Sequence, residues 1–380
     1  MSTNALTGGT IARGLEGAIR ASWPIKRASE LFELRYGKAL VESNRRPGDV
    51  PVYGTNGQTG THDVGLFTGP GVVIGRKGAG HLGVHWAGSD FWVIDTAYSL
   101  VPSEEMDLKF AYYLVKYVGL NHLKHGTSNP SLTRDAFGAQ YFPVPPIDEQ
   151  FAVAKMLATF DDKIESNRKL IDLVPKVIRA RIDSALIRGG DLIPVASLAR
   201  FVNGGAYTKG ATGNGRMVLR IAELNSGPGA STVYNEIDVP EEKTARAGDI
   251  LMSWSGSLGV YRWFRDEAIV NQHIFKVIPN GHPAWLAFDR LDAVMPVFRG
   301  VAADKATTMG HIQRGHLTST EIAVPQRSVI EELDGEMAPL WARLLLAERE
   351  NLRLERLRDT LLPELLSGRT RVAEAQEAVA

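Results

Sequence analysis

The sequence predicts an α+β protein with an internal repeat, in which two β-rich domains are joined by two long helices that pair as a coiled coil. Two observations support this prediction. A proline-containing segment is followed directly by a helical pattern at QYFPVPPIDEQFAVAKML, from Gln140, and again at STEIAVPQRSVIEELDGEM, from Ser319. In both places apolar residues then recur at alternating spacings of four and three over about 40 residues that contain few glycines.

The two halves of the chain keep the same order of landmarks. The first half opens with WPIKRASELFELRYGKAL at Trp23, and the second opens with LIPVASLARFVNGGAYTK at Leu192. Gly83-Val84 matches Gly259-Val260, and Arg134 falls on Arg314. The offset between the halves grows from 168 at their start to 180 at Arg134, so we expect about a dozen additional residues in the second half. At the start of the halves, an offset of 168 matches Ile25, Ala28, Ser29 and Gly37 with Ile193, Ala196, Ser197 and Gly205.

Short β-rich segments bounded by turn residues occupy the first part of each half. The runs GPGVVIGRKG, SDFWVIDTAYSLVP, GDILMSW and EAIVNQHIFKVIP are rich in Val, Ile and aromatic residues. A helix is expected in the first half at DLKFAYYLVKYV, from Asp107.

The last part of each half carries a heptad pattern, which predicts coiled-coil pairing rather than packing on a sheet. At 1.5 Å per residue, each helix would be about 60 Å long. We expect Asp148 to cap the first helix and Gly189 and Gly368 to end the two helices. We also expect Pro175, Pro339 and Pro363 to kink or interrupt them. The heptad positions are Val153, Leu157, Phe160, Ile164, Asn167, Ile171, Val174, Ile178, Arg181 and Ala185, followed in the second helix by Leu333, Met337, Leu340, Leu344, Ala347, Asn351, Leu354, Arg358, Leu361 and Leu365.

A register for the helix pair follows from these positions. Aligning Val153 with Leu365 in an antiparallel pair places Asn167 opposite Asn351. Two facing amides can hydrogen-bond, whereas a slip by one heptad would bury both without a partner. The alternative is a seam that splays here and leaves both amides hydrated. The same register sets Phe160 against Arg358, which requires the guanidinium to turn outward.

These patterns predict five segments. They are the first β-rich domain (1–147), the first long helix (148–189), the second β-rich domain (190–326), the second long helix (327–368) and a C-terminal tail (369–380).

Composition excludes several classes of protein and site. The 380 residues include no cysteine, so disulfides, cysteine-zinc sites and thiol nucleophiles are absent. No run of 18 apolar residues is present and the N-terminus lacks a signal-peptide pattern, so we expect a cytoplasmic protein with no membrane contact. The formal net charge is zero, which disfavours a free-standing binder of nucleic acid but allows local basic patches.

No motif commits the chain to catalysis or to a metal. The segment GPGVVIGRKGAG from Gly69 lacks the Gly-Lys-Ser/Thr of a P-loop, and we interpret it as a turn that carries Arg76 and Lys77 to an exposed edge. His81 and His85 follow glycines in β-like sequence, where they would not share the face of a helix. We therefore predict no catalytic residues, no metal site and no cofactor of the chain's own.

The remaining polar residues suit recognition of DNA, because Arg, Lys, Asn and Gln read base edges while Ser, Thr and His serve phosphates or bases. The candidates are Arg76, Lys77, Lys124, Asn129 and Arg134 in the first half and Lys209, Arg220, Trp254, His273, Lys305 and Arg314 in the second.

The duplicated layout resembles the specificity subunit of type I restriction-modification enzymes, from about Trp23 to Gly368. PVPPIDEQFAVAKMLATFDDKIE looks like the family's proline-proline-x-x-glutamate-glutamine helix start, and LRDTLLPELLSG and VVIGRKGAGHLGV are similar to other family segments. The second half departs from the pattern, with Val324-Pro325-Gln326 and no glutamate-glutamine pair.

The resemblance implies two target-recognition domains, each reading half of a split, asymmetric sequence in double-stranded DNA. It implies two spacer helices that pack antiparallel, relate the two domains by a pseudo-two-fold axis and dock two methylation subunits. Motor/nuclease subunits would complete the restriction enzyme. S-adenosylmethionine, ATP and Mg would then be bound by these partner subunits. Two other classes stay open, a self-contained DNA-modifying enzyme and a double-headed DNA-binding regulator.

Overall fold

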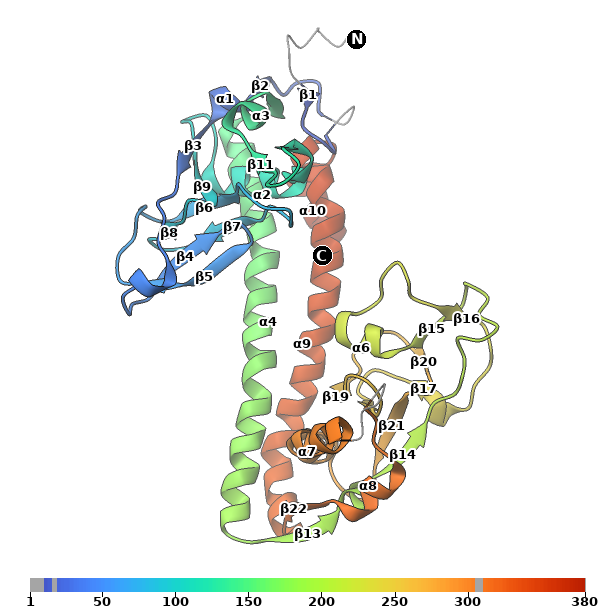
Figure 1. The fold of residues 1–380 in the computed structure, drawn as a ribbon. Coiled ribbons are helices and arrows are strands. Elements are labelled where there is room, and N and C mark those ends of the chain that lie inside the picture. The colour runs from blue at the N-terminus through green and yellow to red at the C-terminus, as the bar shows by residue number, and fades with distance from the viewer. Residues whose placement is uncertain (1–9, 16–18, 305–309, 380) are drawn as a thin grey trace. The chain divides into compact units, whose positions relative to one another are not determined.

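The computed structural model describes residues 10–15, 19–304 and 310–379. They form two compact units, unit 1 (Met1–Asp162 with Leu354–Ala380) and unit 2 (Lys163–Arg353). Each unit combines one β-rich part with a stretch of both long helices, α4 (Ile147–Ile187) and α9 (Arg327–Ser367), drawn in green and red in Figure 1. The expected α+β class with two β-rich parts and two long helices is confirmed. The five-segment division of the chain stays a prediction.

Unit 1 is built around an antiparallel four-stranded sheet in the order β3-β9-β6-β7. β6 lies inside this sheet and all five of its residues, GVVIG, are buried, whereas β3 alternates buried Phe32 and Leu34 with exposed Glu33 and Arg35. The strands are β3 (Phe32–Tyr36), β6 (Gly71–Gly75), β7 (Val84–Ala87) and β9 (Ala97–Pro102), with smaller sheets formed by β1 (Thr10–Ile11), β12 (Gln140–Pro143) and β2 (Ile25–Arg27), by β5 (Gly57–His62), β4 (Val50–Gly54) and β8 (Trp92–Val93), and by β10 (Lys124–His125) and β11 (Ser131–Leu132).

The helices of unit 1 follow from local signals. The expected helix α2 (Leu108–Val118) is confirmed, and the Asp107 side chain caps it by accepting from the Phe110 N–H at 2.7 Å. It ends at Gly119, whose φ of 67° is open to glycine. The shorter helices are α1 (Ala28–Leu31), α3 (Arg134–Gly138) and α10 (Val372–Val379).

Unit 2 repeats the topology of unit 1. Its four-stranded sheet has the order β14-β21-β18-β19, and a second sheet pairs β15 with β20 in parallel, as β4 pairs with β8 in unit 1. The strands are β14 (Ala199–Asn203), β18 (Ile250–Ser253), β19 (Gly259–Arg262), β21 (Ile274–Pro279), β15 (Arg216–Leu219), β16 (Tyr234–Asn235), β17 (Thr244–Ala245), β20 (Ala268–Val270), β13 (Gly190–Pro194) and β22 (Glu321–Pro325), and the helices are α5 (Val195–Leu198), α6 (Ile221–Ser226), α7 (Ala284–Asp304) and α8 (Arg314–Ser319).

The predicted offset at the start of the repeat is wrong by one residue. β3 pairs with β9 from Phe32 opposite Pro102, and β14 pairs with β21 from Ala199 opposite Pro279, so the offset here is 167 and Gly37 corresponds to Gly204. Matching the Ala-Ser pairs of the two halves by identity produced the slip. A slip by one residue would turn every strand side chain to the opposite face of the sheet. The later match of Arg134 with Arg314 is confirmed, since each begins a short helix.

The long helices follow the predicted heptads. Every heptad position is buried or half-buried except Arg181, which turns outward to Glu336 with 3.0 Å between Nη2 and Oε2. Gly189 and Gly368 follow the two helices with positive φ, as expected.

Two details of these helices differ from expectation. α4 begins at Ile147, because the carbonyl of Pro146 already accepts from the Gln150 N–H, so Asp148 lies in the first turn and is not the cap. Neither helix is interrupted at Pro175, Pro339 or Pro363, whereas a kink at these prolines stays a prediction. Apolar packing on both sides of each proline outweighs the one backbone hydrogen bond that it removes.

The antiparallel register is visible within each unit. In unit 2, Asn167 Nδ2 donates to Asn351 Oδ1 at 3.0 Å and to Glu350 Oε2 at 2.9 Å, and both asparagines are buried. In unit 1, the Arg358 guanidinium turns away from buried Phe160 and donates to Asp161 Oδ1 at 2.8 Å. The seam therefore stays closed at the asparagines and does not splay.

Each β-rich part is anchored to the helix pair by buried polar contacts. In unit 1, the fully buried Gln150 side chain accepts from the Asp107 N–H and donates to the carbonyls of Glu105 and Pro145, each at 2.8 Å. The neighbouring Glu149 accepts from the Trp23 indole at 3.2 Å. The glutamate-glutamine pair thus joins the start of α4 to its own domain.

Unit 2 uses other residues for the same purpose. The buried Arg262 guanidinium on β19 holds Glu348 of α9 through two contacts of 2.6 and 2.9 Å, and it lies 4.5 Å from the centre of the Trp341 ring. Burial raises the pKa of the Glu348 carboxyl, and the interaction with Arg262 offsets only part of that rise. Nε1 of the buried Trp285 on α7 donates to Asp334 at 2.7 Å.

The asparagine pair generates a test of the register. Replacing Asn167 by leucine should lower the free energy of unfolding by about 1–3 kcal/mol, because it strips the buried Asn351 amide of its main partner. Replacing both asparagines by leucine should recover most of that loss but weaken the register. Urea unfolding of the single and double variants measures the first effect. Since the chain has no cysteine, disulfide formation in a Val174→Cys, Leu344→Cys background reports the second. A double variant as unstable as the sum of its single variants would contradict the pairing.

Candidate nucleic-acid interface

The glycine-rich loop after β6 is fixed by its backbone to two other segments of unit 1. The Arg76 N–H donates to the Thr96 carbonyl at 2.9 Å, and the Arg76 carbonyl accepts from the Leu132 N–H at 2.8 Å. The Gly78 N–H donates to Pro130 at 3.0 Å. The loop therefore connects β6 to β7, as the sequence predicted, and is held beside β11 and the start of β9.

Two arginines enclose a tyrosine beside this loop. The Arg76 guanidinium lies 4.8 Å from the centre of the Tyr36 ring and 5.4 Å from that of Tyr98, while Arg134 at the start of α3 lies 4.2 Å from Tyr36. Tyr36 is 50% exposed, whereas Tyr98 is buried beneath it with 5.0 Å between ring centres. We call Tyr36, Arg76, Tyr98 and Arg134 the unit 1 cluster. It joins cations to aromatic faces, an arrangement that also suits the stacking of bases.

The loop cations Arg76 and Lys77 are less exposed than the sequence predicted. Arg76 and Lys77 are half-buried and already have partners, since Arg76 Nη1 donates to the Asp95 carbonyl at 2.9 Å and Lys77 Nζ lies 3.8 Å from an Asp95 carboxylate oxygen. Lys124 is also engaged, because its ammonium donates to the carbonyls of the loop, at 2.8 Å for Gly80. It stabilises the loop rather than standing free.

In unit 2 the equivalent loop is held by three matching backbone hydrogen bonds, and we call this set of three bonds in each unit its backbone frame. The Trp254 N–H donates to the His273 carbonyl at 3.2 Å, and the Trp254 carbonyl accepts from the Ile312 N–H at 3.0 Å. The Gly256 N–H donates to Gly310 at 3.1 Å. Trp254 therefore occupies the place of Arg76, and His273 that of Thr96.

The side chains on the second frame are different. The Trp254 indole packs against the His273 ring at 5.4 Å and the buried Phe275 ring at 5.9 Å between centres, and its Nε1 donates to Asn203 Oδ1 at 3.0 Å. His273 is exposed. We call Asn203, Trp254, His273 and Phe275 the unit 2 cluster. It presents an amide, an imidazole and an indole where unit 1 presents arginine and tyrosine.

The remaining candidates fall into three groups. Asn129, Lys209 and Arg314 are exposed, the last at the start of α8. Lys305 lies outside the described residues. Arg220 is bound inside unit 2, where its guanidinium donates to the buried Glu223 carboxylate at 2.5 and 3.0 Å and to the Ser231 carbonyl at 2.7 Å. Its donors stabilise α6, so its assignment to a recognition surface is not supported by this geometry.

Sequence reasoning missed Tyr36, Tyr98, Asn203 and Phe275. The pairings of Tyr36 with Tyr98 and of Asn203 with Phe275 join strands far apart in the chain. The available signal was the repeat itself, because the offset of 167 places Tyr36 on Asn203. The one-residue slip in the alignment hid this match.

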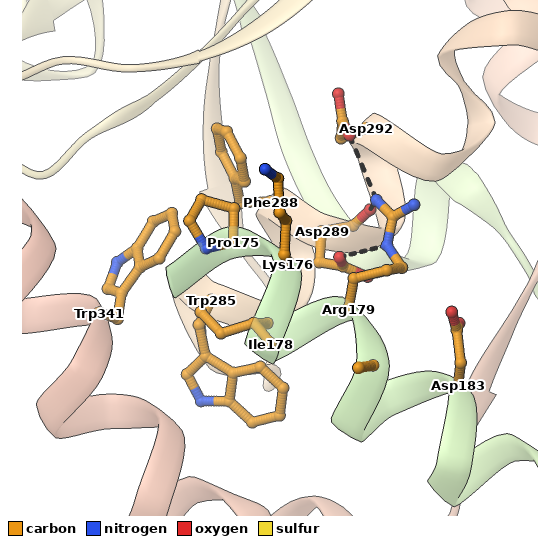
Figure 2. Close-up of a pocket in the computed structure, with 11 residues that line it drawn as sticks. Pro175, Lys176, Ile178, Arg179, Asp183, Trp285, Phe288, Asp289, Asp292 and Trp341 are labelled. Atoms are coloured by element: carbon orange, nitrogen blue, oxygen red, sulfur yellow. Dashed lines mark hydrogen bonds and ion pairs between the residues drawn. The ribbon is translucent and has the colours of Figure 1, made fainter. Parts of the chain in front are cut away.

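A cavity of about 350 Å³ lies elsewhere in unit 2, between α4, α7 and α9. Figure 2 shows its aromatic wall of Trp285, Phe288 and Trp341 and, on another side, Arg179 bonded to Asp289 and Asp292. These side chains attach α7 to the helix pair. In the ranges that the structure describes, no group of three or more His, Asp or Glu residues could hold a metal ion, and no helix is long and apolar enough to cross a membrane.

Comparison with known proteins gives a consistent set of similarities. The family model described as Type I restriction modification DNA specificity domain matches residues 21–176. The chain is 21% identical over 320 residues to the Type I restriction enzyme MjaIX specificity subunit of Methanocaldococcus jannaschii, covering 73% of this chain and 72% of that protein. A putative MjaX specificity subunit of the same organism is 31% identical over 88 residues, which is 23% of this chain and 20% of that one.

A solved structure shares the fold. The crystal structure of the type I restriction-modification system S subunit from M. genitalium superposes with a TM-score of 0.67 at 18% identity, covering 92% of this chain and 97% of that chain.

The binding of Arg220 to Glu223 predicts a structural phenotype. Burial acts to raise the pKa of the Glu223 carboxyl, but hydrogen bonds from Arg220 and Thr232 outweigh it and hold the pKa below its usual value. The ionised pair therefore stabilises the fold above the usual glutamate pKa, and this contribution is lost as the pH falls through the lower folded value. Arg220→Ala should reduce the free energy of unfolding by about 1.5–3 kcal/mol at pH 7, and the reduction should shrink in acid.

Urea unfolding at several pH values measures this effect. Arg200→Ala is the matched control, because Arg200 forms an exposed ion pair with Glu242 that should contribute about 0–1 kcal/mol. Equal stability of the two variants at pH 7 would contradict the structural role of Arg220.

Proposed function

Because residues 21–176 match the type I restriction-modification DNA specificity domain, we propose that the chain supplies sequence recognition to such an enzyme, with each unit reading one half of a split, asymmetric DNA site. The observation that carries this proposal is the duplicated frame. Two sets of matching backbone hydrogen bonds hold different side chains at equivalent positions. A repeated scaffold with two different surfaces suits a target whose halves differ in sequence.

The candidate contacts divide by chemistry. Exposed Arg134, Lys209 and Arg314 suit phosphate oxygens, because a guanidinium or ammonium neutralises backbone charge in any sequence. Arg76, Trp254 and His273 belong to the two clusters, Lys77 follows Arg76, and all four suit base edges or the adjoining backbone. Asn129 is exposed after the β10 strand, and Lys124 supports the loop. The assignment of these residues to DNA contact is part of the proposal.

We further propose that the chain has no active site and that partner subunits supply the chemistry. The clusters contain two arginines, aromatic rings, one amide and one imidazole, without a carboxylate to pair with that imidazole or a second metal ligand beside it, as nuclease chemistry would use. Two methylation subunits and the motor/nuclease subunits would bind S-adenosylmethionine, ATP and Mg. The zero net charge fits this division, because partners would share the phosphate contacts. Such a complex would work in the cytoplasm.

Two alternatives predict different outcomes. A self-contained DNA-modifying enzyme would act without partners, so homogeneous chain would methylate DNA with S-adenosylmethionine or cut it with Mg²⁺. A double-headed regulator would not co-purify with a methylation subunit. The duplicated clusters alone do not separate these classes, whereas the match of residues 21–176 to the specificity domain favours the specificity subunit.

A domain exchange tests the proposed function. Replacing residues 23–145 by the corresponding segment of another specificity subunit should change one half of the methylated motif and leave the other half unchanged. The measurement is a map of methylated bases in cells that express the chain with its methylation subunit. The isolated chain, incubated with S-adenosylmethionine or Mg²⁺, should leave DNA unmodified. Methylation by the isolated chain, or a change in both halves, would refute the proposal.

The loop cations provide a second test. Replacing both Arg76 and Lys77 by alanine should lower the salt slope of DNA binding by up to about 2 if they contact phosphates. If either reads a base, discrimination at one position should fall by about 1–3 kcal/mol. Arg46→Ala is the control, because this exposed arginine also pairs with an aspartate, Asp63, in the same unit. Both readouts come from DNA binding by the assembled complex, measured over a range of salt concentrations. An unchanged salt slope together with an unchanged motif would remove the loop from the interface.

A further inference from the structure

The two frames allow equivalent residues to be identified without reference to sequence identity. Strand register places Tyr36 opposite Tyr98 and Asn203 opposite Phe275. Backbone hydrogen bonds place Arg76 with Trp254 and Thr96 with His273. The two units therefore share three equivalent positions, Tyr36/Asn203, Arg76/Trp254 and Thr96/His273, which we call the upper positions, beside one buried aromatic residue, Tyr98/Phe275, which we call the floor.

The upper positions differ between the units, whereas their surroundings are alike. All six upper residues are half-buried or exposed, and both floor residues are below 6% exposure. Arg134 and Arg314 are a matched pair, since each is an exposed arginine at the first residue of the equivalent short helix. An identical residue on both frames suits what is common to both half-sites, which is the phosphate backbone.

We propose that the three upper positions determine which bases each unit reads, and that Arg134 and Arg314 make the contact common to both half-sites. This inference rests on the proposed function and assigns residues within it. In unit 1 the guanidinium of Arg76 is a donor held beside the rings of Tyr36 and Tyr98, which fits the O6 and N7 acceptors of guanine. In unit 2 the indole of Trp254 takes the place of Arg76, and the imidazole of His273 and the amide of Asn203 occupy the other two upper positions. This set fits the methyl group and the mixed donor and acceptor pattern of an A·T pair.

The intramolecular contacts of Arg76 support reading rather than simple charge attraction. Its Nη1 donates to the Asp95 carbonyl at 2.9 Å, and its guanidinium lies 4.8 and 5.4 Å from the centres of the Tyr36 and Tyr98 rings. A donor fixed in this way can discriminate between base edges, because a misplaced acceptor cannot be met by a change of rotamer. Arg134 contacts only the outer face of Tyr36 among the ring contacts of the described residues and is exposed, as a phosphate contact can be.

The test is a transplant of the three upper residues within the full complex. The variant Tyr36→Asn, Arg76→Trp, Thr96→His places the unit 2 residues on the unit 1 frame. The measurement is the methylated motif made by the chain with its methylation subunit, with Arg46→Ala as the matched control. We expect the unit 1 half of the motif to change, at the guanine assigned to Arg76, toward the base pair read by unit 2. The unit 2 half and the control motif should be unchanged.

A conservative pair of variants keeps the inference testable if the transplant is inactive. Arg76→Lys retains the charge but loses the planar fork, so discrimination at one position should fall by roughly five- to hundred-fold. Arg134→Lys should leave the motif unchanged, because an ammonium also neutralises phosphate. An active transplant with an unchanged motif would overturn the inference, as would a relaxed motif in Arg134→Lys but not in Arg76→Lys. A unit 1 half-site without guanine would do the same. If the unaltered complex recognises no split site, the proposed function itself fails.

Discussion

The hydrogen bond between Asn167 and Asn351 is the constraint on which the arrangement of unit 2 depends. An apolar seam of repeating heptads tolerates slips of seven residues, because each slip again places apolar residues together. Two buried amides remove that tolerance, since a slipped pair would leave both without a partner. Lys163 adds to this site by pairing with Glu350 at 3.3 Å, so the polar contact extends from the seam to its edge. The pair stabilises one register at the expense of others.

A fixed register matters because each β-rich part is attached to particular residues of the helices. Unit 1 attaches through neutral hydrogen bonds of the buried Gln150 and through the Tyr113 hydroxyl, which donates to Asp161 at 2.8 Å. Unit 2 attaches through the buried ion pair of Arg262 with Glu348 and through Trp285. A buried ion pair needs close geometry to offset the loss of hydration, and the raised pKa of Glu348 shows that this cost is not fully met. The same attachment has thus been built twice with different chemistry.

The features that were predicted from sequence are those with a short or regular pattern. The heptads and the constant offset of 180 located both helices, and the offset is reproduced by their bounds, from Ile147 and Arg327 to Ile187 and Ser367. The asparagine contact could be anticipated because, once the direction of two long paired helices is assumed, only the position of one along the other remains to be determined. The clusters could not, since Tyr36 and Tyr98 meet only through sheet pairing. The contact of Arg220 with Glu223 could have been anticipated, because Glu223 follows it by three residues, a spacing that joins side chains at the start of a helix.

The engagement of the loop cations by their own unit explains how recognition and dependence on partners can coexist. Cations that are free in solution bind phosphate strongly in any sequence, which favours affinity over discrimination. Arg76, Lys77 and Lys124 instead contact carbonyls, a carboxylate and aromatic rings before any DNA is present. Their preorganisation reduces the entropy lost on ordering at a base edge, but it also reduces the positive potential that attracts DNA from a distance. A chain with zero net charge and cations held in this way suits a subunit that selects sequence while its partners supply much of the affinity.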